Sequence, residues 1–200
     1  MTGASSGRRP AGPREPEPEV AKEVTIYIGG IHAAEEPTLV KTLLGSCIAA
    51  CLWDPVNRVG GMNHFMLPRS AEGVRVRDAT RFGVHAMDVL IGEIMKAGGD
   101  RRRLVAKIFG GAHVLDIGGG RTSVPQQNIA FIRSFLAAES FQILSEDVGG
   151  YHARQVQFFT HTGRARVKRV TGTRTETRLA ARQRAADAHP PKFGDVTLFE

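Results

Sequence analysis

Cys47 and His64 are the residues of this sequence whose types and spacing could carry out nucleophilic chemistry. Both lie in one apolar stretch, residues 42–68, TLLGSCIAACLWDPVNRVGGMNHFMLP, with Gly45 and Ser46 directly before the cysteine. The thiolate is the reactive form of cysteine, and a free thiol with a pKa of about 8.5 needs help near neutral pH. A histidine within hydrogen-bond reach gives that help and can later donate a proton. The pair is therefore a candidate nucleophile and general base.

The residues before the cysteine suit the same chemistry. Gly45 and Ser46 permit close approach of the backbone, and amide N–H groups there could stabilise an oxyanion. The pattern leaves other interpretations open, because a cysteine in an apolar run is often a small core residue and His64 could be a hydrogen-bonded core histidine. It also leaves open whether Cys47 begins a helix or lies in a strand. Cys51, four residues on, is predicted to be a core residue.

The sequence predicts neither a metal site nor an organic cofactor. Cys47 and Cys51 with one distant histidine fall short of the four ligands of a structural zinc site. The glycine-rich segments at 110–112 and 118–120 match neither a dinucleotide-binding nor a Walker pattern, and we expect tight turns there. The remaining histidines show no metal-binding spacing and are expected to be surface or structural residues: His32, His85, His113, His152, His161 and His189.

Two predicted strands position the candidate pair. Residues 39–44 and 48–53 are apolar enough for buried strands, with a bend at Gly45 between them. Residues 54–57, Asp-Pro-Val-Asn, carry the chemistry of a turn. Residues 59–67 then form the returning strand of a hairpin, which brings His64 back alongside the Cys47 segment.

The rest of the chain predicts one α/β domain over residues 22–170. Alternation and apolar spacing predict strands at 23–29, 104–109, 141–144, 154–160 and 164–170, and helices from Asp78 or Thr80 to about 97 and over 127–139. Residues 1–21 are expected to be a disordered extension, since they are rich in Pro, Gly, Ser and charge. Residues 171–200 are expected to be a flexible extension with a short docking end. The loop at 68–79 is a candidate rim of the substrate site.

Composition and charge indicate which kinds of partner the protein binds and where in the cell it is expected. The chain has 200 residues and a formal net charge of +7, with a pI near 10.0. Its basic residues are scattered and only 6% of residues are aromatic, so no nucleic-acid partner is predicted. No run of about 20 apolar residues predicts a transmembrane helix or direct membrane insertion. The N-terminus lacks the apolar core of a signal peptide, so we expect a cytoplasmic protein with reduced cysteines.

The same residues carry a resemblance to a known family. The stretch at 43–68, LLGSCIAACLWDPVNRVGGMNHFMLP, resembles the core of the CheD family of bacterial chemotaxis. The similarity covers about residues 22–170 and the last seven residues. It continues through KIFGGA at 107–112, the helix start around Asn128, DVGG at 147–150 followed by Arg154, Thr162-Gly163, and the terminal GDVTLFE.

The resemblance implies an activity, a fold and partners. CheD-like proteins hydrolyse glutamine side chains of methyl-accepting chemoreceptors to glutamate with release of ammonia, without a cofactor. The family nucleophile falls on Cys47 and its general base on His64, and a thioester intermediate is the expected mechanism. The implied fold is an α/β layered sandwich, with mixed β-sheets flanked by helices, similar to toxin-type cysteine deamidases.

A threonine shortly before the nucleophile assists the pair in some members, and here that role falls on Thr42, five residues ahead of Cys47. Some members also bind a chemotaxis phosphatase, which adds a second candidate partner. The alternative function is therefore a non-catalytic chemotaxis adaptor that binds receptors or such a phosphatase.

Overall fold

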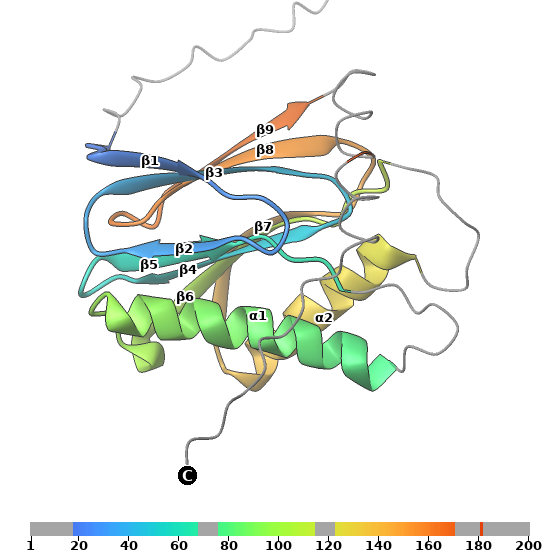
Figure 1. Cartoon of the computed structure of the whole chain (residues 1–200), viewed down its shortest axis with the longest axis horizontal. Helices are drawn as coiled ribbons and strands as arrows, with labels where there is room; N and C mark the ends of the chain where they lie inside the picture. The colour runs from blue at the N-terminus through green and yellow to red at the C-terminus, as the bar shows by residue number, and fades with distance from the viewer. Residues whose placement is uncertain (1–17, 68–75, 115–122, 171–180, 182–200) are drawn as a thin grey trace, which may run out of the picture.

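The computed structural model describes residues 18–67, 76–114, 123–170 and 181, and shows two β-sheets packed face to face, with two helices against the outer face of one sheet (Figure 1). The elements, in chain order, are β1 (Lys22–Thr25), β2 (Ile31–Ala34), β3 (Thr38–Leu44), β4 (Ile48–Asp54), β5 (Val59–Asn63), α1 (Val76–Lys96), the 3₁₀ helix η1 (Arg101–Arg103), β6 (Val105–Gly110), α2 (Val124–Ala138), β7 (Gln142–Val148), β8 (Ala153–Phe159) and β9 (Ala165–Val170).

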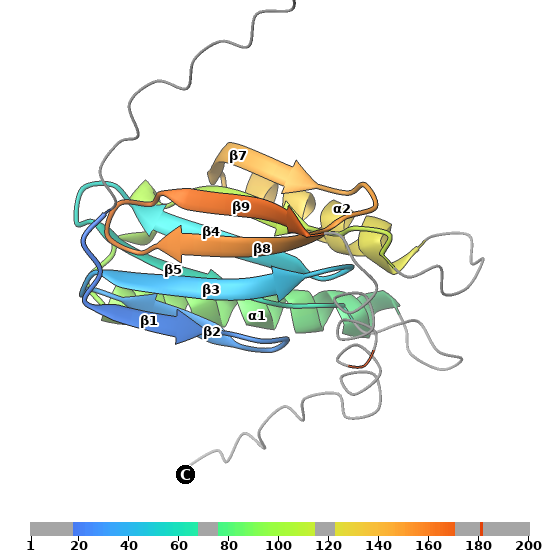
Figure 2. The ribbon, with the colours of Figure 1, turned by 90° about the horizontal axis from the view of Figure 1, so that it is seen from above.

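Both sheets are mixed. The four-stranded sheet has the order β1-β3-β8-β9, and the five-stranded sheet has the order β2-β5-β4-β6-β7. Strands β1 and β3 run parallel, as do β6 and β7, and the other neighbours are antiparallel. The helices cover the five-stranded sheet, so the predicted layered α/β sandwich is confirmed (Figures 1 and 2).

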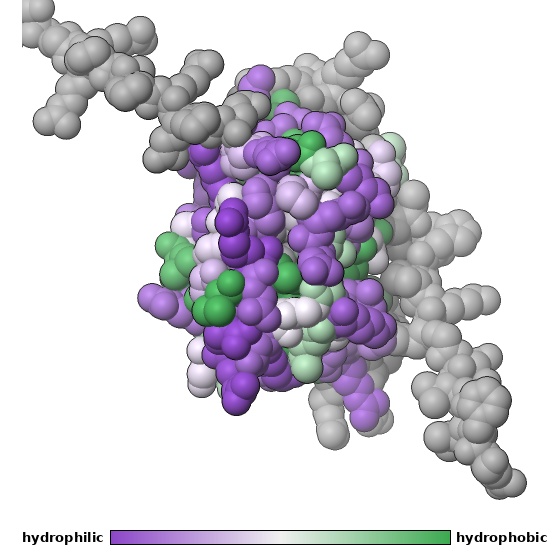
Figure 3. Space-filling model, turned by 90° about the vertical axis from the view of Figure 1, so that its left-hand side faces the viewer, coloured by the Kyte–Doolittle hydropathy of each residue, from purple (hydrophilic) through white to green (hydrophobic). Residues whose placement is uncertain are grey.

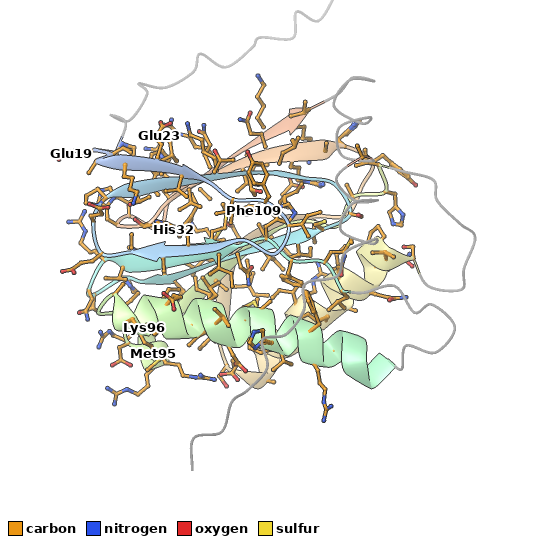
Figure 4. The ribbon with its side chains drawn as sticks, in the orientation of Figure 1. Glu19, Glu23, His32, Met95, Lys96 and Phe109 are labelled. Carbon is orange, nitrogen blue, oxygen red and sulfur yellow. The ribbon has the colours of Figure 1, made fainter. Side chains whose placement is uncertain are left out.

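Strand β4 is buried on both faces and separates two apolar layers. Its side chains alternate along the strand. Ile48 and Leu52 belong to the cluster that includes residues of α1 and α2, and Cys51 belongs to the cluster between the two sheets. Phe109 of β6 lies in that second cluster, and Figure 4 shows it between the sheets. Residues just before β4 are thereby held at the edge of a closely packed core.

Several predicted boundaries differ from the structure. The sequence pattern does not predict β2, because Ile31–Ala34 is short and only half-buried. Helix α1 begins at Val76, ahead of the predicted start at Asp78 or Thr80. Helix α2 begins at Val124 and not at 127, since Ser123 occupies the N-cap position and its N–H donates to the Gln126 side chain at 3.3 Å.

Some expectations fall on segments outside the described residues. These are the extensions at 1–17 and 171–200 apart from residue 181, most of the loop at 68–79, and the glycines at 118–120. In the described ranges, neither α1 nor α2 combines the length and the apolar character that crossing a membrane requires.

Asp54 and Arg103 form an ion pair where β4 turns toward β5. Asp54 is fully buried, and its carboxylate accepts from Arg103 Nη2 at 2.7 Å and from the N–H groups of Val56 and Asp100, each at 2.9 Å. The hydrogen bonds from Arg103, followed by those from the backbone, hold the pKa of Asp54 well below its ordinary value of 3.8. The ionised carboxylate therefore stabilises the folded chain.

We expect Asp54→Asn to lower the free energy of unfolding at pH 7 by about 2 kcal/mol. A depressed folded-state pKa contributes stability above the unfolded-state pKa of about 3.9, and that stability is lost as pH falls toward the folded-state value. The difference between the wild type and Asp54→Asn should therefore be smaller at pH 3 than at pH 7. Urea denaturation at both pH values measures it, with Asp88→Asn, at an exposed position of α1, as control. An equal difference at both pH values would contradict this assignment.

Candidate active site

Cys47 lies in the turn that joins β3 to β4, directly before the first residue of β4. Its side chain is 4% exposed and belongs to the apolar cluster between the sheets. No helix begins at Cys47, which settles the question that the sequence pattern leaves open. The candidate nucleophile therefore sits in a tight strand-to-strand turn at the margin of the core.

His64 follows β5 and lies on the strand that returns alongside the Cys47 turn. The backbone groups of Ile48 and Phe65 exchange two hydrogen bonds of 2.9 Å, which extends the antiparallel pairing of β4 and β5 beyond Asn63. Continued by one residue beyond Ile48, that register makes Cys47 and His64 diagonal neighbours, for which a Cα–Cα separation of about 7–8 Å is typical. The predicted hairpin is confirmed.

A second connection holds the His64 backbone from the other side. Gly29 N–H donates to the His64 carbonyl at 2.7 Å, and His64 N–H donates to the Gly30 carbonyl at 3.0 Å. The turn between β1 and β2 is thus fastened to His64, whose side chain is 4% exposed. The histidine has little freedom to move relative to β4.

Thr42 of β3 contacts the His64 ring. Its Oγ1 lies 2.8 Å from His64 Nδ1 and 2.9 Å from the Ile26 carbonyl oxygen. The carbonyl can only accept, so the single hydroxyl proton of Thr42 is donated to Ile26, and Thr42 Oγ1 accepts from Nδ1–H of His64. This assigns the proton of the neutral imidazole to Nδ1 and leaves Nε2 as its basic nitrogen.

The backbone carbonyl oxygens of residues 45–47 all accept hydrogen bonds from neighbouring segments. Ala112 N–H donates to the Gly45 carbonyl at 2.8 Å, Asn128 Nδ2 donates to that of Ser46 at 2.9 Å, and Gly111 N–H donates to that of Cys47 at 2.7 Å. These bonds define the orientation of each peptide plane in the turn. The pattern of residues does not reveal these partners, which lie more than 60 residues along the chain.

Gly110 and Gly111 are needed for this close approach. Gly110 has φ +109°, and a Cβ there would lie 2.1 Å from the Cys47 carbonyl oxygen. Gly111 has φ +62°, and a Cβ would lie 2.6 Å from the Ile129 side chain. Glycine alone fits both positions, because it accepts positive φ and adds no side chain. The predicted tight turn at 110–112 thus serves to hold the Cys47 turn.

Arg154 holds the neighbouring turn between β7 and β8. Arg154 is 3% exposed, and its guanidinium donates to Asp147 Oδ1 at 2.7 Å and to the Gly149 carbonyl at 2.8 Å. The hydrogen bond from Arg154 lowers the pKa of Asp147 below its ordinary value. The same turn accepts from His113 N–H at the Gly150 carbonyl, at 2.8 Å. The DVGG segment and Arg154 therefore build one wall beside the 110–113 segment.

Cys51 shares the apolar cluster of Cys47 but lies inside a strand and not in the turn. It lies within β4, is 1% exposed, and burial raises the pKa of its thiol far above the ordinary value. The predicted core position of Cys51 is confirmed. Among the described residues, no three His, Cys, Asp or Glu side chains gather in a way that would hold a metal ion.

Asn128 ties both halves of the site together. Its side chain is fully buried, accepts from Leu67 N–H at 2.9 Å and donates to the Ser46 carbonyl. The Cys47 turn and the segment after His64 are thereby attached to the first turns of α2. In the sequence, only the family resemblance singles out Asn128.

We expect Asn128→Ala to lower the free energy of unfolding by about 2–4 kcal/mol, because it leaves a buried N–H and a buried C=O without partners. It should also slow alkylation of Cys47 by iodoacetamide several-fold, since the turn loses its anchor. Urea denaturation and mass spectrometry of the alkylated protein measure the two effects. Ser134→Ala, on the exposed face of the same helix, is the control and should change neither. Unchanged values for Asn128→Ala would contradict the anchoring role.

Comparison with known proteins identifies the family of this chain. A family model described as CheD chemotactic sensory transduction matches residues 66–169, a range that begins after His64. Relatives named "Probable chemoreceptor glutamine deamidase CheD" extend the similarity. The one from Caulobacter vibrioides (strain NA1000 / CB15N) is 43% identical over 189 residues, which is 92% of this chain and 96% of the relative. The relative from Agrobacterium fabrum is 41% identical over 90% of this chain and 97% of its own length. The relative from Sinorhizobium medicae is 44% identical over 84% of this chain and 92% of its own length. The chain therefore belongs to the CheD family.

Proposed function

We propose that this chain hydrolyses glutamine side chains of methyl-accepting chemoreceptors to glutamate and releases ammonia, as a protein-glutamine glutaminase. The names of its relatives support the reaction class. The observation that carries the proposal is the hydrogen-bond chain from His64 through Thr42 to Ile26, beside the Cys47 turn. This chain fixes the His64 ring through Nδ1, which supports a role for Nε2 as the base that serves Cys47. The substrate places the enzyme in the cytoplasm, where thiols stay reduced.

The first step forms a bond between Cys47 Sγ and the carboxamide carbon of glutamine. The thiol proton moves to Nε2 of His64, and the π electrons of the C=O bond move onto its oxygen. The resulting imidazolium keeps its Nδ1–H on Thr42. The hydrogen-bond chain that orients the neutral ring thus also orients the charged one.

Backbone N–H groups of Ser46 and Cys47 are suited to hold the oxyanion. In a planar trans peptide the C=O and N–H point in opposite directions. The Gly45 carbonyl is directed at Ala112 and the Ser46 carbonyl at Asn128, so the N–H groups of the same two peptide units point away from those partners. Preorganised donors of this kind typically contribute about 10²–10³ in kcat each.

Collapse of the tetrahedral species breaks the C–N bond. His64 donates the proton from Nε2 to the departing nitrogen, which leaves as ammonia, and a thioester to Cys47 remains. Water then attacks the thioester carbon while His64 takes its proton, the C–S bond breaks, and the thiol is restored. One water molecule is consumed and the side chain becomes a carboxylate.

Mass spectrometry of a recombinant chemoreceptor cytoplasmic fragment tests the proposal. Incubation with the wild type should add about one mass unit for each glutamine converted, and alkylation of the protein with iodoacetamide beforehand should abolish the shift. A protein that binds the fragment, or a chemotaxis phosphatase, without any mass shift would instead be an adaptor. That result would overturn the enzymatic proposal.

We expect Thr42→Val to lower kcat by about 10–100-fold while leaving the fold intact, because it keeps the side-chain shape and removes the hydroxyl that orients His64. Thr42→Ser should retain most activity. The pH profile of kcat should change in Thr42→Val, since the imidazolium loses its hydrogen-bond acceptor. Deamidation rates across pH measure this. An unchanged profile and rate would show that Thr42 has a packing role only.

A further inference from the structure

Tyr27 and Tyr151 are the two tyrosines of the chain, and both expose large aromatic surfaces. Tyr27 is 53% exposed and Tyr151 is 77% exposed. Exposed aromatic side chains are enriched at protein–protein contacts, because they combine a large apolar area with a polar group. Neither tyrosine takes part in the chemistry proposed above.

The hydrogen bonds of the site place the two tyrosines on opposite sides of Cys47 and His64. Five segments lie side by side at this end of the molecule, in the strand order of the five-stranded sheet. Backbone hydrogen bonds join these segments in order. They connect residues 29 and 30 to residue 64, residue 65 to residue 48, residue 47 to residue 111, and residue 110 to residue 149. Tyr27 belongs to the first segment's turn and Tyr151 follows the last. In Figure 2, β1 and β2 form one edge and β7 lies at the other.

The span between these edges suits a folded helical substrate. Four steps between neighbouring strands correspond to about 19 Å, at ~4.8 Å for each step. Two packed α-helices with axes 8–10 Å apart and diameters of 10–12 Å measure about 20 Å across.

Resting on the function proposed above, we propose that Tyr27 and Tyr151 are substrate-docking residues that contact a packed pair of receptor helices on either side of the target glutamine. The recessed thiol between them then meets a side chain that projects from the helix pair. Because Cys47 and His64 are each 4% exposed, only a side chain that projects from the helix surface can reach them.

Backbone hydrogen bonds also connect the turn that contains Tyr27 to His64. The Tyr27 carbonyl accepts from Gly30 N–H at 2.7 Å, within the turn whose glycines bond to the His64 backbone. Its neighbour Ile26 accepts the hydroxyl proton of Thr42. A substrate helix seated on Tyr27 therefore contacts the turn that holds both His64 and Thr42, which links docking to the position of the general base.

Two of the other exposed large hydrophobic residues provide matched controls. Val56 lies in the turn between β4 and β5 and is 67% exposed, and Met95 lies near the end of α1 and is 49% exposed. Both are at the end of the molecule opposite the site, and Figure 4 labels Met95 there. Figure 3 shows that end to be mostly hydrophilic, with separate hydrophobic spots.

The test measures binding of a recombinant chemoreceptor cytoplasmic fragment to the full chain. A Cys47→Ala background prevents turnover during titration. We expect Tyr27→Ala and Tyr151→Ala each to raise Kd by about 10–30-fold. Tyr→Phe at each position should raise it less, and Val56→Ala and Met95→Ala by less than about twofold. With Cys47 present, the rate of iodoacetamide alkylation should stay within about twofold of wild type in both Tyr→Ala variants, which shows an intact site.

Each outcome separates docking from chemistry. If both Tyr→Ala variants bind the fragment as tightly as the Val56→Ala control does, the docking proposal is wrong, whatever the turnover. If they bind more weakly but the wild type converts no glutamine, docking stands and the proposed deamidation fails. If the parent Cys47→Ala protein does not bind the fragment, docking to this substrate is overturned, and the mass shift alone decides the enzymatic proposal.

Discussion

Cys47→Ala should lower kcat for receptor glutamine deamidation by about 10⁴-fold or more, the largest effect expected of any single substitution. Loss of a covalent nucleophile removes the thioester route altogether, and comparable losses in other covalent hydrolases are of order 10⁴–10⁶. The variant should fold normally, because the side chain is small and sits in a turn. The mass shift of receptor peptides over time measures the rate.

Cys51→Ala is the matched control for this experiment. Both cysteines are buried, lie four residues apart, and belong to the same apolar cluster. We expect Cys51→Ala to cost about 1 kcal/mol of stability through lost packing and to retain most of the activity. Equal losses of activity in the two variants would show that packing, and not nucleophilic chemistry, explains the effect of Cys47→Ala.

His64→Ala should lower kcat by about 10²–10⁴-fold, the second largest effect. The thiol loses the base that ionises it, and the departing ammonia loses its proton donor. Residual activity should rise with pH, since solution hydroxide can ionise the thiol at higher pH. Rates of deamidation from pH 6 to pH 9 measure this.

The double variant makes the assignment specific. If Cys47 and His64 act as one unit, Cys47→Ala with His64→Ala should be no slower than Cys47→Ala alone, because the contribution of the base depends on the nucleophile. Additive losses would show that His64 acts independently of the thiol. In that case its contact with Thr42 would be part of the core rather than of the reaction.

The hairpin that positions Cys47 and His64 could be predicted because its signals are local. Apolar runs, the Asp54–Asn57 turn and the following glycines lie within one short stretch, so pattern and turn chemistry agree. The start of α2 was harder to predict, because Val124 and Pro125 resemble loop residues until Ser123 is seen to cap them. Strand β2 carries too few buried side chains for its alternation to be visible.

The hydrogen-bond partners of the site could not be predicted from local patterns. Ile26, Asn128 and Gly111 each contact the 42–48 segment from distant positions in the chain. Their residue types fit many roles, and no spacing identifies an acceptor carbonyl or a buried amide. Resemblance to the CheD family singles out Thr42, but the contact with His64 Nδ1 is a property of two packed sheets.

By itself, the sequence of this protein determined an α/β chain in which a hairpin brings a thiol and an imidazole alongside each other, since these features depend on residues close together in the chain. Tertiary structure alone decided the tautomer of His64, the peptide orientations around Cys47 and the placement of Tyr27 and Tyr151. Each of these arises where the four-stranded sheet, helix α2 and the turn after β7 meet the Cys47 turn. Such contacts form only when the whole fold has assembled, because they join segments that the chain order keeps apart.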